Sequence, residues 1–161
     1  MTQEHILTVK NSDIIKQVEA RTFKFGKARD NGQADKLINN VKLTDMPYDR
    51  SMIHQWIEQA IGNIKSAFIK YSCCISTEYE TYSQHDSERD DHLITHLKFV
   101  LSSKWPQCNG DGFDTDCHEY IVNKVVSDFL SLSLPREADL YAQKATQALK
   151  DAERKLYFKF G

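Results

Sequence analysis

The 161-residue chain contains few residues that break regular structure and no long apolar segment. It has only three prolines and six glycines, which form neither a linker nor a glycine-rich phosphate loop. No apolar run approaches the roughly 20 residues that cross a bilayer, and the N-terminus lacks a basic-then-apolar secretion signal. We therefore expect a single domain over residues 1–161 that has no membrane contact.

A basic excess is also missing, because 21 Lys and Arg residues are outnumbered by 23 Asp and Glu residues. Proteins that bind nucleic acids in general usually carry a basic surplus. The four cysteines include the neighbours Cys73 and Cys74, and their spacing matches no secreted disulfide framework. These features favour an ordinary globular protein that assembles in a reducing cytosol.

Hydrophobic periodicity predicts a mainly helical α+β fold with about four helices and a small antiparallel β element. The main helices are expected at Ser12–Gly26, from about Asp49 to Tyr71, at 120–130 and from Pro135 onward, with a short helical piece at 37–41. Alternating apolar residues predict an N-terminal edge strand at 5–10 and two strands at 74–82 and 92–101, joined by a polar loop.

The segment Cys108–Glu119, CNGDGFDTDCHE, is the first candidate for a metal site because it gathers carboxylates, two thiols and a histidine. Each possible frame of a calcium-binding loop lacks either the terminal bidentate glutamate or the glycine of the sharp turn. The spacing of Cys108 and Cys117 exceeds that of the tight cysteine pairs in structural zinc sites. We therefore expect a polar loop without metal, whose Asp114 or Asp116 caps the following helix.

The segment HDSERDDH, residues 85–92, is a second acidic cluster with histidines. A charged run between two strands is typical of a solvated loop tip. The chain contains no G-x-S-x-G or H-E-x-x-H motif. We expect no catalytic residue, no bound metal and no cofactor. The opposing hypothesis is a divalent-metal-dependent hydrolase that uses the histidines and aspartates.

Two segments are candidates for contacts with partners. In ARTFKFGKAR, residues 20–29, basic and aromatic residues alternate as phosphate contacts require, although one basic helix face with aromatic core anchors explains the same pattern. In the C-terminal KLYFKFG, aromatic residues lie where few others remain to cover them, which favours either a partner or packing back onto the domain. The candidate residues are Arg21, Lys24, Lys27 and Arg29 for phosphate, and Tyr157, Phe158, Lys159 and Phe160 for docking.

The order of these segments resembles that of small virion proteins of tailed bacteriophages and prophages, especially those of Bacteroidetes hosts. The resemblance covers a strand followed by ARTFKFGKAR, a Trp-containing helix, two strands and a W-P loop. It ends with HEYIVNKVVSDFLSLSLP and ADLYAQKATQALKDAERKLYFK. It implies a head–tail connector subunit, which forms a homo-oligomeric neck ring between the portal protein and other neck or tail proteins. It also implies location in the virion, assembly in the host cytoplasm, and passage of double-stranded DNA without sequence recognition, with residues 157–161 as a docking tail.

The physical properties of the chain agree with this expectation. A ring needs two different faces on each subunit, and a net charge of −2 disfavours tight binding to the DNA that slides through it. We expect the acidic segments HDSERDD and CNGDGFDTD to face the channel or a neighbouring ring, and charge reversal of Asp86, Glu88, Asp90 and Asp91 to test this. The alternative is a small cytosolic regulator that binds nucleic acid through Arg21–Arg29.

Overall fold

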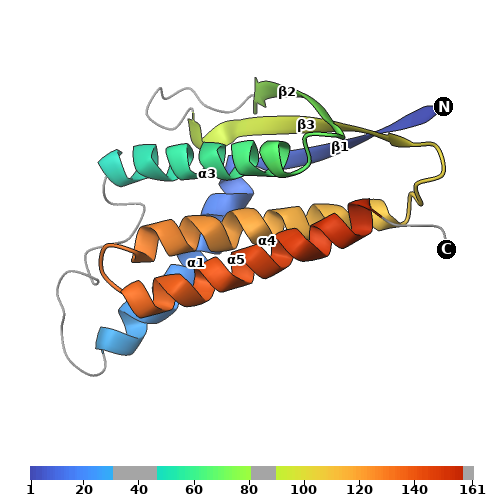
Figure 1. Cartoon of the computed structure of the whole chain (residues 1–161). Coiled ribbons are helices and arrows are strands. Elements are labelled where there is room, and N and C mark those ends of the chain that lie inside the picture. Colours follow the sequence, from blue (N-terminus) through green and yellow to red (C-terminus); the bar gives the residue numbers. More distant parts are fainter. Residues whose placement is uncertain (31–46, 81–89, 158–161) are drawn as a thin grey trace.

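A computed structural model describes the backbone of residues 1–30, 47–80 and 90–157, and the side chains of these residues except 24–30 and 47–50. Within these ranges the predicted mainly helical α+β fold is confirmed (Figure 1). The expected helical piece at 37–41 lies outside the described residues. The elements are β1 (Thr2–Lys10), α1 (Asn11–Asp30), α3 (Pro47–Ala67), β2 (Ser72–Tyr79), β3 (Leu93–Ser102), α4 (Asn109–Leu130) and α5 (Pro135–Leu156).

The three strands form an antiparallel sheet in the order β1-β3-β2, so the last strand in the sequence lies in the middle. Leu97 at its centre pairs with Leu7 of β1 on one side and with Ile75 of β2 on the other. The predicted alternation in β3 is confirmed, since Leu97, Phe99 and Leu101 are buried on the inner face. The alternate residues of β3 lie on the outer face of the sheet.

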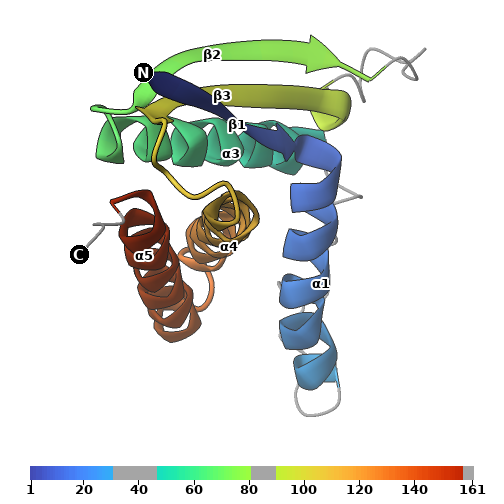
Figure 2. The ribbon, with the colours of Figure 1, turned by 90° about the vertical axis from the view of Figure 1, so that its right-hand side faces the viewer.

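Helices α3 and α4 cover the inner face of the sheet. The Phe99 ring of β3 lies 6.4 Å from the Phe68 ring, just after α3, and 5.1 Å from the Phe113 ring of α4. Helix α5 packs against α4 and forms an outer layer, as Figures 1 and 2 show. No described helix lies over the outer face of the sheet (Figure 2).

Polar and charged side chains explain why the outer face can remain in water. Lys98 lies 3.1 Å from Glu4, and His96 lies 2.9 Å from Glu78. The hydrogen bond and charge of Glu4 raise the pKa of Lys98. Exposed ion pairs of this kind contribute little to stability, but they keep the surface hydrated.

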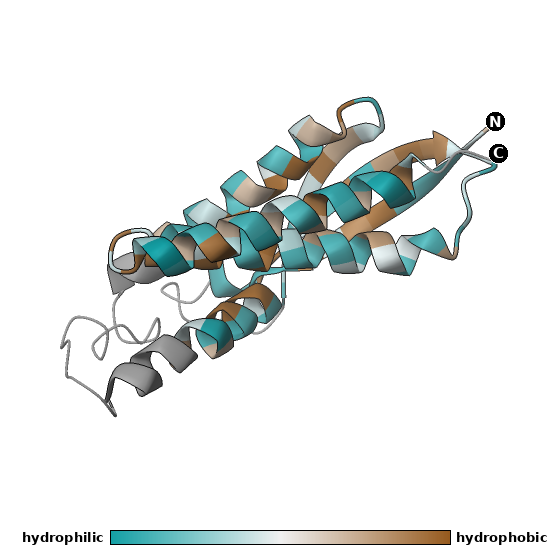
Figure 3. Cartoon of the chain, turned by 60° about the horizontal axis from the view of Figure 1, so that its bottom comes forward, coloured by the Kyte–Doolittle hydropathy of each residue, from teal (hydrophilic) through white to brown (hydrophobic). Residues whose placement is uncertain are grey.

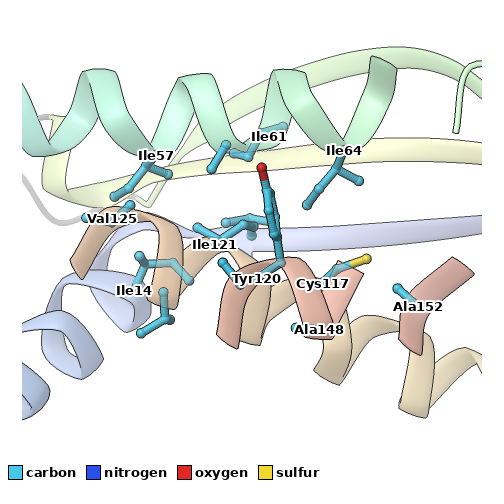
Figure 4. Close-up of a cluster of buried hydrophobic side chains, with 14 of the residues drawn as sticks. Ile14, Ile57, Ile61, Ile64, Cys117, Tyr120, Ile121, Val125, Ala148 and Ala152 are labelled. Atoms are coloured by element: carbon cyan, nitrogen blue, oxygen red, sulfur yellow. The ribbon is translucent and has the colours of Figure 1, made fainter. Parts of the chain in front are cut away.

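The apolar stripe predicted for the second main helix is confirmed. Figure 4 shows Ile57, Ile61 and Ile64 of α3 facing Tyr120 and Ile121 of α4. Small side chains on α5 allow that helix to approach α4 closely. The buried alanines of α5 are Ala138, Ala145, Ala148 and Ala152. None of the described helices is long and apolar enough to span a membrane.

Helix α1 differs from the prediction at both ends. It begins at Asn11, directly after β1, so Ser12 lies inside the helix and is not its N-cap. Asn11 is almost fully buried, and its side chain donates to the backbone carbonyl of Asp90 at 3.0 Å. The helix also continues through Gly26, because one glycine costs only about 0.5–1 kcal/mol in a helix.

The polar loop predicted at Cys108–Glu119 is wrong, because α4 begins at Asn109 and includes almost all of this stretch. Phe113 and Cys117, one turn apart, are both fully buried and anchor this part of the helix in the core. Asp114 and Asp116 therefore lie inside the helix and do not cap it. The polar composition of this segment suggested a loop, although its buried residues recur at helical spacing.

Candidate assembly surface

Strand β2 is an edge strand with one open side within the described part of the chain. The backbone N–H of Glu80 donates to the carbonyl of His92 at 3.0 Å, next to β3. Because hydrogen-bonded and non-hydrogen-bonded residues alternate along an antiparallel strand, Ile75 and Thr77 direct their backbone N–H and C=O away from β3. No described group forms a hydrogen bond with these outward groups.

The opposite edge of the sheet, β1, is partly covered. The same alternation directs the backbone of Thr8 away from β3. There Nε2 of His118 on α4 donates to the Thr8 carbonyl at 2.8 Å. The two edges therefore differ at this position: β1 has one outward carbonyl engaged by α4, whereas the outward groups of Ile75 and Thr77 in β2 have no described partner.

A groove of about 380 Å³ lies beside β2, between its inner face and α3. Ile57, Ile61 and Ile75 form much of its apolar lining. Ile75 faces the core side of the sheet, yet 41% of it is exposed. Gly62 also lines the groove, and a side chain there would meet no atom within 4 Å. The isolated subunit thus gives no steric reason for a helix-interior glycine, which costs about 1 kcal/mol relative to alanine.

Polar residues close one end of this groove. The Asn11 side-chain amide donates to Nδ1 of His54 at 3.2 Å, and Nε2 of His54 donates to Asp91 Oδ1 at 2.7 Å. Both ring nitrogens of His54 are therefore engaged, and the ring has no free lone pair to accept a substrate proton. This arrangement joins α1, α3 and the segment before β3. We call the open edge of β2 together with this groove the β2 surface.

Two further exposed apolar side chains belong to the connection between α4 and α5 and to the first turns of α5; this connection lies away from β2 (Figure 1). Leu132 in this connection is 82% exposed, and Leu140 in α5 is 56% exposed. The outward side of α5 is otherwise mainly hydrophilic, as Figure 3 shows. We call Leu132 and Leu140 the turn surface.

The residues predicted to contact phosphate are only partly described. Arg21 donates from Nη1 to Asn123 Oδ1 at 2.6 Å and from Nη2 to Glu119 Oε1 at 2.8 Å. It lines a cleft of about 470 Å³ between α1, α4 and α5, which also contains the carboxylates of Asp116 and Asp151. Arg21 is thus held by α4 in a mixed-charge surface. The side chains of Lys24, Lys27 and Arg29 lie outside the described residues.

The predicted docking tail begins at a packed residue. The Tyr157 ring lies edge-to-face with the Tyr71 ring at 5.2 Å between centroids, and Tyr157 is 37% exposed. Partial burial, together with Tyr71, raises the pKa of the Tyr157 hydroxyl. Phe158, Lys159 and Phe160 lie outside the described residues.

The structure divides the candidate metal ligands of Cys108–Glu119 among different neighbours. Asp114 pairs with His5 of β1 at 2.7 Å, and Asp116 pairs with Lys155 of α5. No group of three or more potential ligands gathers around a single point among the described residues. The expectation that CNGDGFDTD is a loop is therefore wrong, because this stretch is a packed helix. That its carboxylates face the channel or a neighbouring ring stays a prediction.

The other acidic segment, residues 85–92, is described from Asp90 onward. Asp91 binds His54, and His92 lies 3.4 Å from Glu80. Reversing the charge of Asp91 would break its contact with His54 as well as altering a loop. Asp86 and Glu88, which complete the predicted acidic cluster, lie outside the described residues.

The four cysteines differ in chemical accessibility. Cys73, Cys74 and Cys108 are exposed, whereas Cys117 is fully buried. Burial raises the pKa of the Cys117 thiol above its usual value of 9.0, and the carboxylates of Asp114 and Asp116 act in the same direction. Its contribution to stability is therefore complete below pH 9 and decreases at higher pH, where the unfolded chain forms the thiolate first.

Iodoacetamide labelling at pH 8 will modify three thiols of the native protein and all four in denaturant, because the thiolate is the reactive form. Intact-mass spectrometry counts the adducts. Rapid addition of a fourth adduct under native conditions would show that Cys117 is accessible and that the first turns of α4 are not packed as described.

Comparison with known proteins gives no relative: no family model, curated protein or solved structure matches this chain. The open side of β2 is the main feature that the sequence did not predict. The one available signal was the scarcity of large apolar residues in Ser72–Tyr79, since a central strand carries more of them.

Proposed function

We propose that the chain is a structural subunit of an oligomeric ring in the head–tail connector, or neck, of a tailed bacteriophage. In this proposal it joins the portal to the tail, resides in the virion after assembly in the host cytoplasm, and performs no catalytic step. The order of its elements resembles that of connector subunits. The described surfaces support an assembly role on physical grounds.

The observation that carries the proposal is the presence of exposed apolar side chains at two separate places on one subunit. The β2 surface has an open strand edge and a groove, and the turn surface exposes Leu132 and Leu140. A subunit that stands between different neighbours needs more than one contact surface, and ring contacts must join unlike faces. Exposed apolar groups beside polar surroundings are typical of protein contacts.

The charge distribution supports passage of DNA in preference to its binding. The net charge is −2, and Arg21 is engaged by Glu119 and Asn123. A protein gains affinity for DNA by neutralising phosphates with free basic groups. A nucleic-acid-binding regulator that uses Arg21–Arg29 is therefore less well supported, because the first of its basic residues has a structural partner.

The environments of two histidines, His54 and His96, also support a structural role. Both ring nitrogens of His96 are engaged, by Thr8 Oγ1 at 3.0 Å and by Glu78 Oε1 at 2.9 Å, as are both nitrogens of His54. A general base needs a free nitrogen directed at a substrate. These rings instead connect neighbouring elements of the fold.

Truncation after Tyr157 tests the proposed docking tail. This variant keeps the contact between Tyr157 and Tyr71, so we expect unchanged circular dichroism and thermal unfolding. We also expect the truncated protein to be missing from purified particles in a complementation assay, because the aromatic side chains proposed to bind the portal are removed. Deletion of Gly161 alone is the matched control and should leave incorporation intact. Normal incorporation of the truncated chain would refute the docking role of the tail.

A further inference from the structure

The open edge of β2 has a backbone pattern that another extended strand can complete. The outward N–H and C=O groups of Ile75 and Thr77 have no described partner, and every residue from Cys73 to Tyr79 is exposed. Exposed edges of this kind are templates for pairing with a further strand unless charge, proline or a covering element blocks them. No proline lies in β2, and no described element covers its edge.

The sequence of β2 is complementary to itself when Thr77 lies on a two-fold axis. Antiparallel pairing about Thr77 places the Thr77 residues of two copies opposite each other, as a hydrogen-bonded pair that uses their outward groups. Ile75 then lies opposite Tyr79 of the second copy, on the same face of the sheet. A pair of a β-branched and an aromatic residue contributes about 0.2–1 kcal/mol relative to two alanines.

The charges of β2 are compatible with this register. Glu78 lies opposite Ser76 of the second copy, and Glu80 lies opposite Cys74, so no like charges meet directly. Within its own subunit Glu78 already pairs with His96. The register therefore adds no carboxylate pair that would repel.

The face to which the outward-bonding residues belong decides which strand of a second copy fits best against β2. It favours the second copy's β2 over its β1. The outward backbone groups of β2 belong to residues whose side chains face the core side, such as Ile75 and Thr77. Those of β1 belong to residues of the outer face, such as Ile6 and Thr8. Antiparallel pairing of β2 with β1 would turn the neighbouring sheet over and place its helices on the opposite side. Parallel pairing would keep the same face, but it would compete with His118 for the Thr8 carbonyl.

Self-pairing would also cover the groove beside β2. Tyr79 is 42% exposed, and in this register its ring in the second copy lies across from Ile75, which lines the groove. Gly62 on the other wall leaves space for an approaching side chain. The apolar exposure and the unused backbone groups thus have the same explanation.

We propose that two copies of this chain pair through β2, antiparallel and centred on Thr77, so that their described strands form one continuous six-stranded sheet with the described helices on one side. A two-fold contact closes on itself and does not extend a ring. Self-pairing through β2 therefore excludes a ring contact through the same edge. A monomeric free protein would refute the pairing and leave the β2 surface available for a ring contact.

Sedimentation velocity of the full chain in reducing buffer tests the pairing. We expect a concentration-dependent dimer, and we expect Thr77→Pro to raise its dissociation constant at least about 10-fold. Proline removes the outward N–H of Thr77 and leaves the hydrogen bonds between β2 and β3 in place. Thr77→Val keeps the backbone groups and is the matched control, which should still dimerise. An all-monomer wild type, or a dimer that Thr77→Pro does not weaken, would overturn the proposal.

Disulfide cross-linking tests the register without depending on the proline variant. We expect Thr77→Cys, in a chain with Cys73, Cys74 and Cys108 changed to serine, to form a covalent dimer under mild oxidation. The matched control retains Cys74 as its one exposed cysteine beside the buried Cys117, with Cys73 and Cys108 changed to serine. In the proposed register its two copies lie about 20 Å apart, at roughly 3.3 Å per residue, and stay unlinked. Cross-linking of the Cys74 control but not of Thr77→Cys would contradict the register.

Discussion

Replacing Phe113 with alanine will lower the free energy of unfolding by about 3–5 kcal/mol. The Phe113 ring is fully buried, and its centroid lies 5.1 Å from Phe99, 5.8 Å from Phe68 and 5.8 Å from His5. It thus connects the first turns of α4 with the sheet and with α3. Urea unfolding followed by circular dichroism measures the loss.

Two variants in the same helix control for this result. Phe113→Leu keeps most of the buried volume and should lose clearly less stability than the alanine variant. Thr115→Ala changes an exposed residue two positions away and should stay within about 0.5 kcal/mol of wild type. A loss below about 1 kcal/mol for Phe113→Ala would mean that this stretch is not packed as a helix, which would reopen the question of a loop.

Replacing Arg21 with alanine will lower the free energy of unfolding by about 2–3 kcal/mol and leave DNA affinity unchanged. Asn123 is 4% exposed, so its side-chain oxygen would lose a partner within the protein, and Glu119 would lose a charge-assisted hydrogen bond. Urea unfolding and a gel shift at several salt concentrations measure the two effects.

Arg21→Lys is the control for this substitution, because a single ammonium cannot reproduce the fork of the guanidinium and should recover only part of the stability. The nucleic-acid-binding alternative predicts a different outcome. If Arg21 contacts phosphate, the alanine variant will bind DNA more weakly, and its salt dependence will fall by about one counterion. That result, with stability unchanged, would contradict the structural role of Arg21.

Much of the fold could be predicted because the relevant patterns are local. The isoleucines of α3 recur at helical spacing, and Leu97, Phe99 and Leu101 alternate in β3, so each pattern identifies its own buried face. Pro135 marks the start of α5, as expected for proline at a first helical turn. These features depend on few contacts beyond the element itself.

The remaining features depend on contacts between distant residues. The order β1-β3-β2 leaves β2 at an open edge, and no periodicity within one strand reveals which strand lies in the middle. The stretch Cys108–Glu119 resembles a loop in composition, but Phe113 reaches a pocket made by Phe68 and Phe99. The partners of Arg21 are likewise about 100 positions away in the sequence. Long-range pairing of this kind decides the candidate surfaces, so the sequence alone identified neither.

The composition of purified particles tests the central proposal most directly. Quantitative mass spectrometry of tailed particles made from the genome that encodes this chain should find it in a fixed ratio to the portal protein. Negative-stain labelling with an antibody should place it between head and tail. Absence of the chain from intact, infectious particles, or its presence only in trace amounts unrelated to the number of portals, would contradict the account.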